Sequence, residues 1–231
     1  MATSTVENYI KQIYLEEQRH EGHPVPMGKL AAALKVFPGT ATTMIKSLAE
    51  ANLVAYESRV GVRLTGSGEK LALHVLRRHR VIELFLVKVL DMNWSEVHEE
   101  AENMEHALSD EVLARMEKFL GYPTVDPHGD PIPSPKGELD ERELVKLTEC
   151  SPGSELRIGR VLDQEGKFLR FLEKNGLELG VTVKLLEMDP VGQTVSMSVE
   201  GAGKTATLSL GVAEKIEAEL LGEEKSQKDE G

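Results

Sequence analysis

Residues Trp94 to Leu113 read WSEVHEEAENMEHALSDEVL and carry the most informative pattern in the chain. Two histidines and two glutamates recur in it at offsets of four, seven and eight residues, a spacing that places side chains on one face of a helix. These four residues are His98, Glu102, Glu105 and His106. Two imidazoles and two carboxylates suit a borderline-hard divalent cation such as Mn²⁺ or Fe²⁺.

A second His/Glu pair lies upstream in LRRHRVIELFL, where His79 and Glu83 stand four residues apart. Two helical segments would then each present such a pair to the space between them. The segment with His98, Glu102, Glu105 and His106, taken alone, also fits an acidic face exposed to solvent. Together they predict a metal site in the middle of the chain.

The composition is that of a globular protein. The chain has 231 residues, 40% of them hydrophobic and 29% charged, which suits one to three domains. No apolar run approaches the roughly 20 residues needed to span a bilayer, and MATSTVENYIKQ has no leader pattern. Because the single cysteine, Cys150, excludes an internal disulfide, a reducing compartment fits as well. We therefore expect a cytoplasmic protein that does not contact a membrane.

The charge is uneven along the chain, although the net charge is −12. Residues 1–80 carry 11 basic and 7 acidic side chains, a net of +4, and the remainder carries −16. This asymmetry is compatible with a DNA-reading head attached to an acidic, metal-binding body.

The first third of the chain has the pattern of a winged helix. Helical periodicity runs through STVENYIKQIYLEEQ, with Ser4 or Thr5 as its cap, and resumes in MGKLAAALKV and TATTMIKSLAEANL. Pro38 and Gly39 form a turn between the last two segments. LVAYESR and GVRLT then alternate as a hairpin, and a helix-turn-helix followed by a hairpin is a DNA-binding arrangement.

The rest of the chain divides into a helical part and a β-rich part. One helix is expected from Ser67 to about Leu90, and another from a capping box at Asn93 to about Leu120. The proline-rich GYPTVDPHGDPIPSPKGELD marks a boundary, and the short strands beyond it suggest a small β-barrel. The predicted fold is mainly α with β. Its predicted parts are a DNA-binding domain at 1–72, a helical domain with linker at 73–140, a barrel at 150–221 and a disordered tail at 222–231.

Four motifs in this order resemble the diphtheria toxin repressor family of metal-dependent transcriptional repressors. They are YIKQIY, RRHRVIELFL, VHEEAENMEHALSDEV and PHGDPIP. The resemblance implies an N-terminal winged helix-turn-helix, a helical metal-binding and dimerisation domain, and a C-terminal SH3-like domain.

The resemblance also implies two metal sites. The ancillary ligands match His79, Glu83 and His98, completed by a third-domain ligand for which Asp163, Gln164 and Glu165 are candidates. Primary ligands match Glu102, Glu105 and His106, with Asn8 as the ligand from the first helix.

The identity of the ligands points to manganese. Glu102 stands where iron-responsive members have cysteine, so the chain resembles the manganese-responsive branch. Lys11 stands where manganese regulators that lack the third domain often have a carboxylate. For DNA, we expect exposed residues of the recognition helix and wing to make contact, with threonine hydroxyls donating to phosphates and threonine methyls touching thymine. These residues are Thr40, Thr42, Thr43, Lys46, Arg59 and Arg63.

The sequence thus predicts a homodimeric repressor, activated by Mn²⁺, that binds a palindromic operator and controls metal-uptake genes. Fe²⁺ is the alternative effector, and other divalent transition metals are expected to bind in vitro. We do not expect an enzyme, because no catalytic base remains outside the ligand set. The rival interpretations are a metallohydrolase with an N-terminal partner-binding module and a metal-storage protein.

Overall fold

The computed structural model describes residues 3–140, 142–201 and 203–222. The chain divides into two compact units. The first contains Met1–Ile82, Ala101–Tyr122 and Ile132–Leu139, and the second contains Glu83–Glu100, Pro123–Pro131 and Asp140–Gly231. The predicted disordered tail lies outside the described residues from residue 223 onward.

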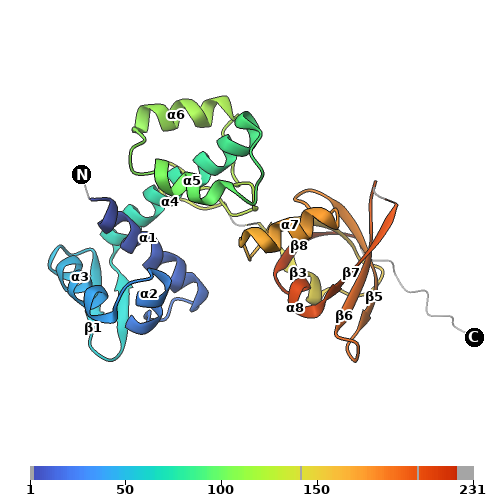
Figure 1. Cartoon of the computed structure of the whole chain (residues 1–231), viewed down its shortest axis with the longest axis horizontal. Coiled ribbons are helices and arrows are strands. Elements are labelled where there is room, and N and C mark those ends of the chain that lie inside the picture. Colours follow the sequence, from blue (N-terminus) through green and yellow to red (C-terminus); the bar gives the residue numbers. More distant parts are fainter. Residues whose placement is uncertain (1–2, 141, 202, 223–231) are drawn as a thin grey trace, which may run out of the picture. The chain divides into compact units, whose positions relative to one another are not determined.

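Three helices and a two-stranded hairpin form the N-terminal part of the first unit (Figure 1). They are α1 (Ser4–Arg19), α2 (Met27–Ala33), α3 (Pro38–Glu50), β1 (Val54–Glu57) and β2 (Gly61–Leu64). Their inward apolar side chains share one core, in which Ile10, Leu30 and Ile45 are fully buried. The winged helix predicted from the sequence is confirmed.

Helix α1 begins slightly earlier than predicted. Thr3 is its N-cap, and Thr3 Oγ1 accepts a hydrogen bond from the Val6 amide at 3.4 Å. The predicted cap, Ser4 or Thr5, is wrong because three consecutive hydroxyl residues give nearly the same local signal.

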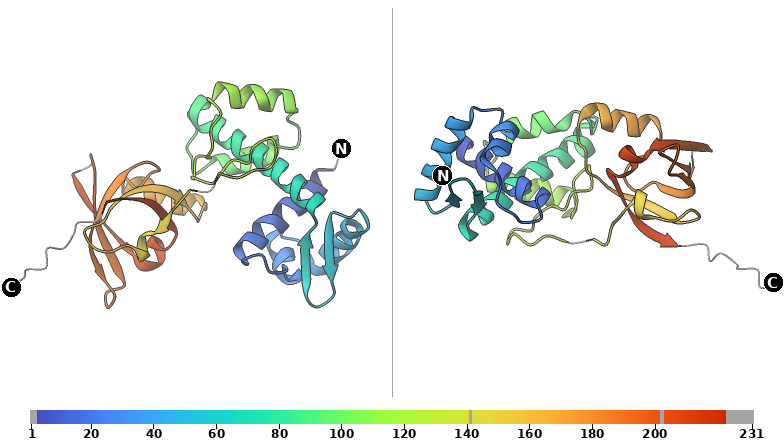
Figure 2. Two further views of the ribbon diagram at one scale, coloured as in Figure 1. Left: turned by 180° about the vertical axis from the view of Figure 1, so that it is seen from behind. Right: turned by 90° about the horizontal axis from the view of Figure 1, so that it is seen from below.

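The wing is a short antiparallel hairpin in which Val54 pairs with Leu64 and Glu57 pairs with Gly61 (Figure 2). Gly61 has a φ of 144°, and a Cβ at this position would lie 2.5 Å from the Val25 carbonyl oxygen. Only glycine therefore allows the second strand to approach the segment that leads into α2.

Three further helices follow the wing, namely α4 (Gly66–Leu90), α5 (Val97–Met104) and α6 (Asp110–Phe119). Arg77 of α4 forms an ion pair with Glu117 of α6 within the first unit. Helices α4 and α5 each contribute residues to both units.

The single helix predicted from Asn93 to about Leu120 is wrong. Asn93 Oδ1 accepts a hydrogen bond from the Ser95 amide, and the helix begins only at Val97. A second start occurs at Ser109, whose side chain caps α6. Serine followed by two acidic residues favours a helix start, but the continuing apolar period concealed it. Glu105 and His106 consequently lie in the turn after α5 rather than on its face.

The loop that carries PHGDPIP is ordered by one carboxylate. Asp126 Oδ1 accepts hydrogen bonds from the amides of His128, at 2.8 Å, and Asp130, at 2.9 Å. Gly129 has a φ of 89°, and a Cβ there would meet the Gly159 carbonyl oxygen at 2.1 Å. This loop therefore packs closely against the β-rich part of the second unit.

That β-rich part is a six-stranded sheet in the order β3-β8-β4-β5-β6-β7. Its elements are β3 (Val145–Lys146), η1 (Leu147–Glu149), β4 (Glu155–Val161), α7 (Gly166–Lys174), β5 (Thr182–Asp189), β6 (Thr194–Val199), β7 (Lys204–Ser209), α8 (Leu210–Ala213) and β8 (Ile216–Gly222). Its core combines side chains from the strands with Leu169 and Leu172 of α7. The sequence predicts four strands here, ELRIGRVL, TVKLLEM, TVSMSVEG and KTATLSL. It thus misses β3 and β8, although β8 alternates apolar residues with Glu217 and Glu219.

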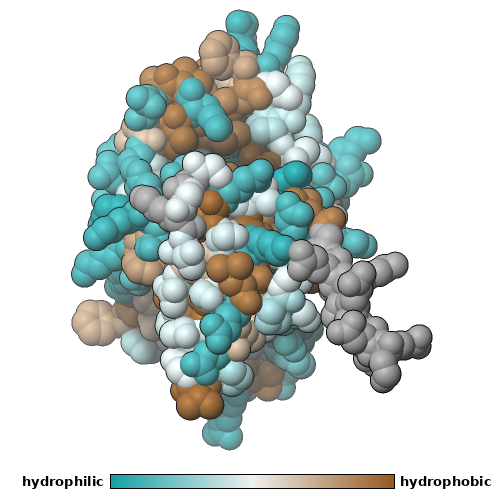
Figure 3. Space-filling model, turned by 90° about the vertical axis from the view of Figure 1, so that its right-hand side faces the viewer, coloured by the Kyte–Doolittle hydropathy of each residue, from teal (hydrophilic) through white to brown (hydrophobic). Residues whose placement is uncertain are grey.

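The surface of this β-rich part carries scattered apolar side chains. Leu162, Phe171, Leu186 and Val191 are exposed. The space-filling view in Figure 3 shows small groups of hydrophobic side chains among hydrophilic ones. Scattered exposure of this kind is normal for globular proteins.

Candidate metal centre

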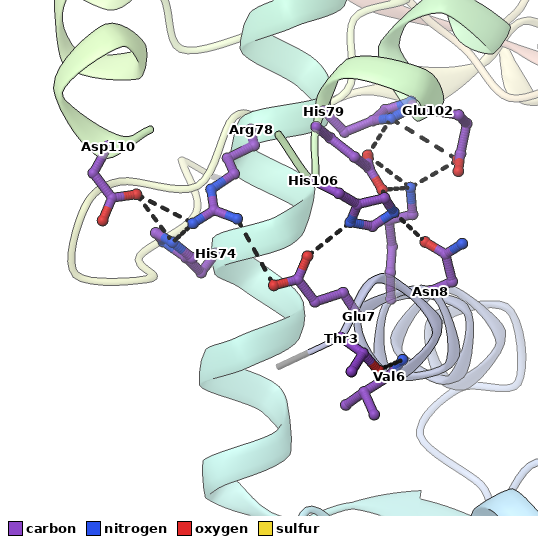
Figure 4. A network of polar contacts seen from close by, with 12 residues as sticks. Thr3, Val6, Glu7, Asn8, His74, Arg78, His79, Glu102, His106 and Asp110 are labelled. Carbon is purple, nitrogen blue, oxygen red and sulfur yellow. Dashed lines mark hydrogen bonds and ion pairs between the residues drawn. The ribbon is translucent and has the colours of Figure 1, made fainter. Parts of the chain in front are cut away.

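Helix α1 presents three polar side chains to the residues that end α5. Glu7, Asn8 and Lys11 are neighbours on one face of α1, because at about 100° per residue their side chains lie within an arc of about 100° around the helix axis. Figure 4 shows Glu7 and Asn8 pointing toward His106. The apolar face of the same helix, including Ile10 and Ile13, is buried in the core and holds this polar face in place.

Glu105 is the centre of the cluster and is fully buried. Its Oε2 lies 2.7 Å from Nδ1 of His79, which α4 supplies. One ligand atom each from His79, Glu102 and Glu105 lies within 4.8 Å of the others, which is a spacing that one cation can bridge. We call His79, Glu102, Glu105 and His106, together with Asn8, the primary cluster.

His106 links this cluster to α1 through both ring nitrogens. Nδ1 lies 2.7 Å from Glu7 Oε2, and Nε2 lies 2.7 Å from Asn8 Oδ1 and 3.4 Å from Glu105 Oε1. Asn8, the predicted first-helix ligand, therefore lies within hydrogen-bond distance of His106. Glu7, which the sequence prediction did not single out, orients the imidazole in the way that a carboxylate partner orients a metal-binding histidine.

The ammonium group of Lys11 lies among these carboxylates. Lys11 Nζ is 2.7 Å from Glu102 Oε1, 2.6 Å from Glu105 Oε1 and 2.8 Å from Glu105 Oε2. Burial raises the pKa of the Glu105 carboxyl, but the His79 hydrogen bond and the charges of Lys11 and His79 outweigh burial and hold that pKa below its usual value. The carboxylates thus already hold a cation, which shows that their geometry fits one.

A second group of donors lies in the second unit and was not predicted as a site. Glu83, Asp126 and His128 are all buried, and one ligand atom from each lies within 4.8 Å of the others. We call these residues the buried triad. His128 Nδ1 lies 3.8 Å from Glu83 Oε2 and 4.0 Å from Asp126 Oδ2.

The hydrogen bonding of His128 favours a cation in the buried triad. Its Nε2 lies 2.9 Å from the Trp94 carbonyl oxygen, which can only accept, so Nε2 carries a hydrogen. Nδ1 is buried without a hydrogen-bond partner among the described residues. In the neutral ring, a lone pair on Nδ1 then faces two carboxylates, an arrangement that a divalent cation would stabilise. The residues present therefore fit a metal ion. From the sequence alone we expect His128 to cap or order its loop; the local signal for a site is the acid and imidazole spacing in DPHGD.

The predicted ancillary residues are distributed over both units. Within the second unit, His98 Nδ1 lies 3.2 Å from Glu83 Oε1, although the His98 side chain is more than half exposed. His79 belongs to the first unit, where Glu105 of the primary cluster is its partner.

Two of the three third-domain candidates, Gln164 and Asp163, have partners of their own. Gln164 donates to Asp130 Oδ2 at 2.9 Å, in the loop that carries His128. Asp163 is paired with Lys215 at 2.7 Å. Burial raises the pKa of the Asp163 carboxyl, but the hydrogen bond from Lys215, the hydrogen bond from the Glu165 amide and the charge of Lys215 together outweigh burial and lower it.

The predicted DNA-contacting residues lie on α3 and in the wing, and most are exposed. Thr40, Thr43, Lys46, Arg59 and Arg63 are exposed, and Thr42 is half-buried. The hydroxyls of Thr42 and Thr43 donate to the carbonyls of Pro38 and Gly39, at 2.8 and 3.0 Å. Because each hydroxyl has one donor, these groups do not offer that donor to phosphates in this structure. The methyl groups of Thr42 and Thr43 can still contact thymine, and the hydroxyl oxygens can still accept hydrogen bonds.

In the described ranges, none of the helices is both long enough and apolar enough to cross a membrane.

Three family models match the chain in sequence order. "Iron dependent repressor, N-terminal DNA binding domain" matches residues 1–62, and "Iron dependent repressor, metal binding and dimerisation domain" matches residues 65–134. "FeoA domain" matches residues 145–220.

Individual relatives agree with these matches. The iron-dependent repressor IdeR of Mycobacterium tuberculosis is 35% identical over 162 residues, which are 67% of this chain and 69% of the relative. A solved manganese-dependent transcriptional repressor in complex with manganese is 35% identical, has a TM-score of 0.83, and covers 94% of this chain and 100% of its own. The repressor ScaR with bound Zn²⁺ is 32% identical, with a TM-score of 0.74, and covers 93% of this chain and 98% of its own.

Proposed function

This chain belongs to the diphtheria toxin repressor family of metal-dependent transcriptional repressors, and from that premise we propose that it is activated by Mn²⁺ and represses metal-uptake genes in the cytoplasm. The family consists of transcriptional repressors rather than enzymes, so the metallohydrolase interpretation is set aside. The observation that carries the proposal is the oxygen-rich cluster around Glu102 and Glu105.

The donor set supports manganese over softer metals. Glu102 contributes a carboxylate where a thiolate would favour iron and later transition metals, and Asn8 contributes an amide oxygen. Binding affinity by itself rises from Mn²⁺ to Fe²⁺ and beyond at almost any site. We therefore place the selectivity in geometry, with Mn²⁺ as the ion that engages Asn8 of α1 together with Glu105. Fe²⁺ remains the alternative effector.

Each proposed ligand has a distinct role. Glu105 and Glu102 supply negative charge, His106 supplies a nitrogen oriented by Glu7, and Asn8 connects the site to the DNA-reading part of the first unit. A bound divalent cation supplies the positive charge that joins these side chains. We also propose the buried triad as a third set of metal donors, in addition to the ancillary set of His79, Glu83 and His98 with Asp163 or Gln164.

On DNA, we propose a homodimer that meets two major-groove half-sites of a palindromic operator. The matched dimerisation domain covers residues 65–134, and we propose contact through the helices at residues 75–120. Lys46, Arg59 and Arg63 would supply phosphate contacts, and Thr40, Thr42 and Thr43 would touch base edges or the backbone. The proposed domain limits are 1–72, 73–140 and 150–221.

The test is operator binding under anaerobic conditions with Mn²⁺, with Fe²⁺ and with chelator, using DNA from upstream of metal-uptake genes. Wild-type protein should bind with Mn²⁺ at least as well as with Fe²⁺, and chelator should release it. Glu102→Cys should shift the response toward Fe²⁺ and Co²⁺, because a thiolate favours them. Tight binding in chelator would contradict metal activation, and metal binding without any effect on DNA binding would favour a storage protein. A response to Fe²⁺ but not Mn²⁺ would contradict only the choice of metal.

A further inference from the structure

We propose that Lys11 is a tethered cation that holds Glu102 and Glu105 until a divalent metal displaces its ammonium group, so that Lys11 sets the metal concentration at which the primary cluster fills. This inference rests on the proposed function, because it concerns the regulation of the same site. The contacts that carry it join Lys11 of α1 to Glu102 and Glu105. Figure 4 shows Glu102, His106 and Asn8 of the same network.

The ammonium group of Lys11 is fully engaged by the two carboxylates. Lys11 Nζ has three N–H donors, and it contacts three carboxylate oxygens, one from Glu102 and two from Glu105, at 2.6–2.8 Å. The Lys11 side chain is buried, and the Glu105 side chain is completely buried. Such an enclosed ammonium replaces solvent as the partner of Glu105.

A metal ion and this ammonium compete for the same oxygens. A divalent cation binds carboxylate oxygens at roughly 2.0–2.2 Å. With both oxygens of Glu105 shared, the ion and Nζ would be separated by only a few ångströms inside a buried site, where like charges repel strongly. Lys11 must therefore leave Glu105 before the carboxylate can take a divalent ion as its partner.

Replacement of the Lys11 ammonium by a metal ion affects how metal activates DNA binding. Lys11 already connects α1 to Glu102 and Glu105, so α1 and the end of α5 are linked before metal arrives. Once Lys11 leaves, α1 would remain linked to this segment through Asn8 Oδ1 and His106 Nε2, which already lie 2.7 Å apart, and through the ion that the primary cluster would hold. The free energy lost with the Lys11 contacts is subtracted from metal binding, which raises the metal concentration required.

Substitution of Lys11 tests the competition. Mn²⁺ affinity is measured by calorimetry for wild type, Lys11→Met and the control Lys70→Met, and each is repeated with Glu105→Gln to identify the binding phase that depends on Glu105. Lys70 is an exposed lysine of α4, so its substitution makes the same charge change away from the site. Lys11→Met should tighten the Glu105-dependent phase by about tenfold to a hundredfold, the size expected for lost charged hydrogen bonds. Lys70→Met should leave it unchanged.

A second measurement on the wild-type protein remains informative even if Lys11→Met folds poorly. Acetylation of individual lysines is followed by mass spectrometry with and without saturating Mn²⁺. Lys11 should be protected without metal and labelled about ten times faster or more with it, while the rate at Lys70 stays constant.

The outcomes separate this inference from the proposed function. Unchanged Glu105-dependent affinity in Lys11→Met, or unchanged labelling of Lys11 while Mn²⁺ binds, overturns the competition but leaves a metal-activated repressor standing. Loss of DNA activation by metal in the wild type, with the tightened affinity of Lys11→Met intact, overturns the proposed function and leaves the competition standing.

Discussion

At the scale of single residues, the cluster shows how one helix position can alter a metal site without removing a ligand. Lys11 neighbours Asn8 on α1, and its charge offsets one of the two carboxylates that it contacts. A neutral amide at Asn8 and a cation at Lys11 both make the cluster less negative than a set of carboxylates alone. Both changes lower the attraction for Mn²⁺, and this favours a sensor that responds only at higher metal concentration.

The buried triad gives a prediction of its own. His128→Gln removes the nitrogen whose lone pair faces Glu83 and Asp126, so the metal stoichiometry should fall by about one ion per subunit. Isothermal titration with Mn²⁺ measures this, with His23→Gln as the control because His23 is exposed and distant from both clusters in sequence. Binding that depends on Glu105 should persist. Unchanged stoichiometry would remove the triad from the metal-binding residues.

His74 predicts a pH dependence of stability. Burial, followed by the charge of Arg78, lowers the pKa of His74 below its ordinary value of 6.5. The neutral ring accepts a hydrogen bond from Arg78 at 2.8 Å, and protonation would break it. Because the folded-state pKa is the lower one, the unfolded chain binds the proton more readily. The neutral His74 ring therefore makes its full contribution to the free energy of unfolding above about pH 6.5. That contribution is lost as the pH falls toward the folded-state pKa.

The measurement is the free energy of unfolding in urea between pH 7.5 and 5. His74→Gln should reduce the fall in stability over this range by less than about 1 kcal/mol, since His74 is partly exposed and its interactions are screened. His23→Gln is the matched control. An identical pH profile for His74→Gln and wild type would show that His74 does not contribute.

The sequence predicted some of the site residues through local spacing but not others. Helical periodicity in the sequence predicts that Glu102, Glu105 and His106 lie on one face of a helix. The three side chains lie close together although α5 ends at Met104. The positions of Glu7 and Lys11 against them depend on contacts more than 90 residues apart in the chain. No local pattern carries that information, and a lysine reads as a solvent-exposed residue unless its partners are known.

At the scale of secondary-structure elements, the errors of the sequence prediction have a common cause. The apolar period continues through the turn after α5, so the sequence predicts one helix where the structure has two. Ser109 caps the second of them, α6. Strand β8 was overlooked beside a polar tail, although its pairing with β4 makes it central to the sheet. Periodicity identified the type of most elements, but the ends of elements depend on capping and on tertiary contacts.

The wing supplies a prediction at this scale. Gly61→Ala should destabilise the first unit by about 1–3 kcal/mol, because the residue has a positive φ and its Cβ would meet the Val25 carbonyl. Gly28→Ala is the control, since Gly28 lies in α2 with open space around it and alanine favours helix. Thermal unfolding should show a loss for the first variant and none for the second. Equal melting temperatures for wild type and Gly61→Ala would contradict a constrained wing.

At the scale of the whole molecule, the chain combines a basic N-terminal segment with a strongly acidic remainder. Non-specific attraction to DNA therefore has to come from a few basic side chains on α3 and the wing rather than from the net charge. A dimer doubles each such contact. The slope of log K for DNA binding against log salt is consequently proportional to the number of phosphate contacts that both subunits make together.

Lys46→Ala provides the last prediction. Lys46 is exposed on α3, beside the threonines expected at the base edges, and a dimer would lose about two phosphate contacts with it. The slope of log K against log salt should then become shallower by about 2, and affinity should fall to a similar extent on operator and on random DNA. The slope and the affinities can be measured by fluorescence anisotropy with saturating Mn²⁺, at salt concentrations from about 50 to about 300 mM. Lys174→Ala on exposed α7 is the control and should match wild type. A loss confined to the operator would instead assign Lys46 to base recognition, and an unchanged slope would place it outside the interface.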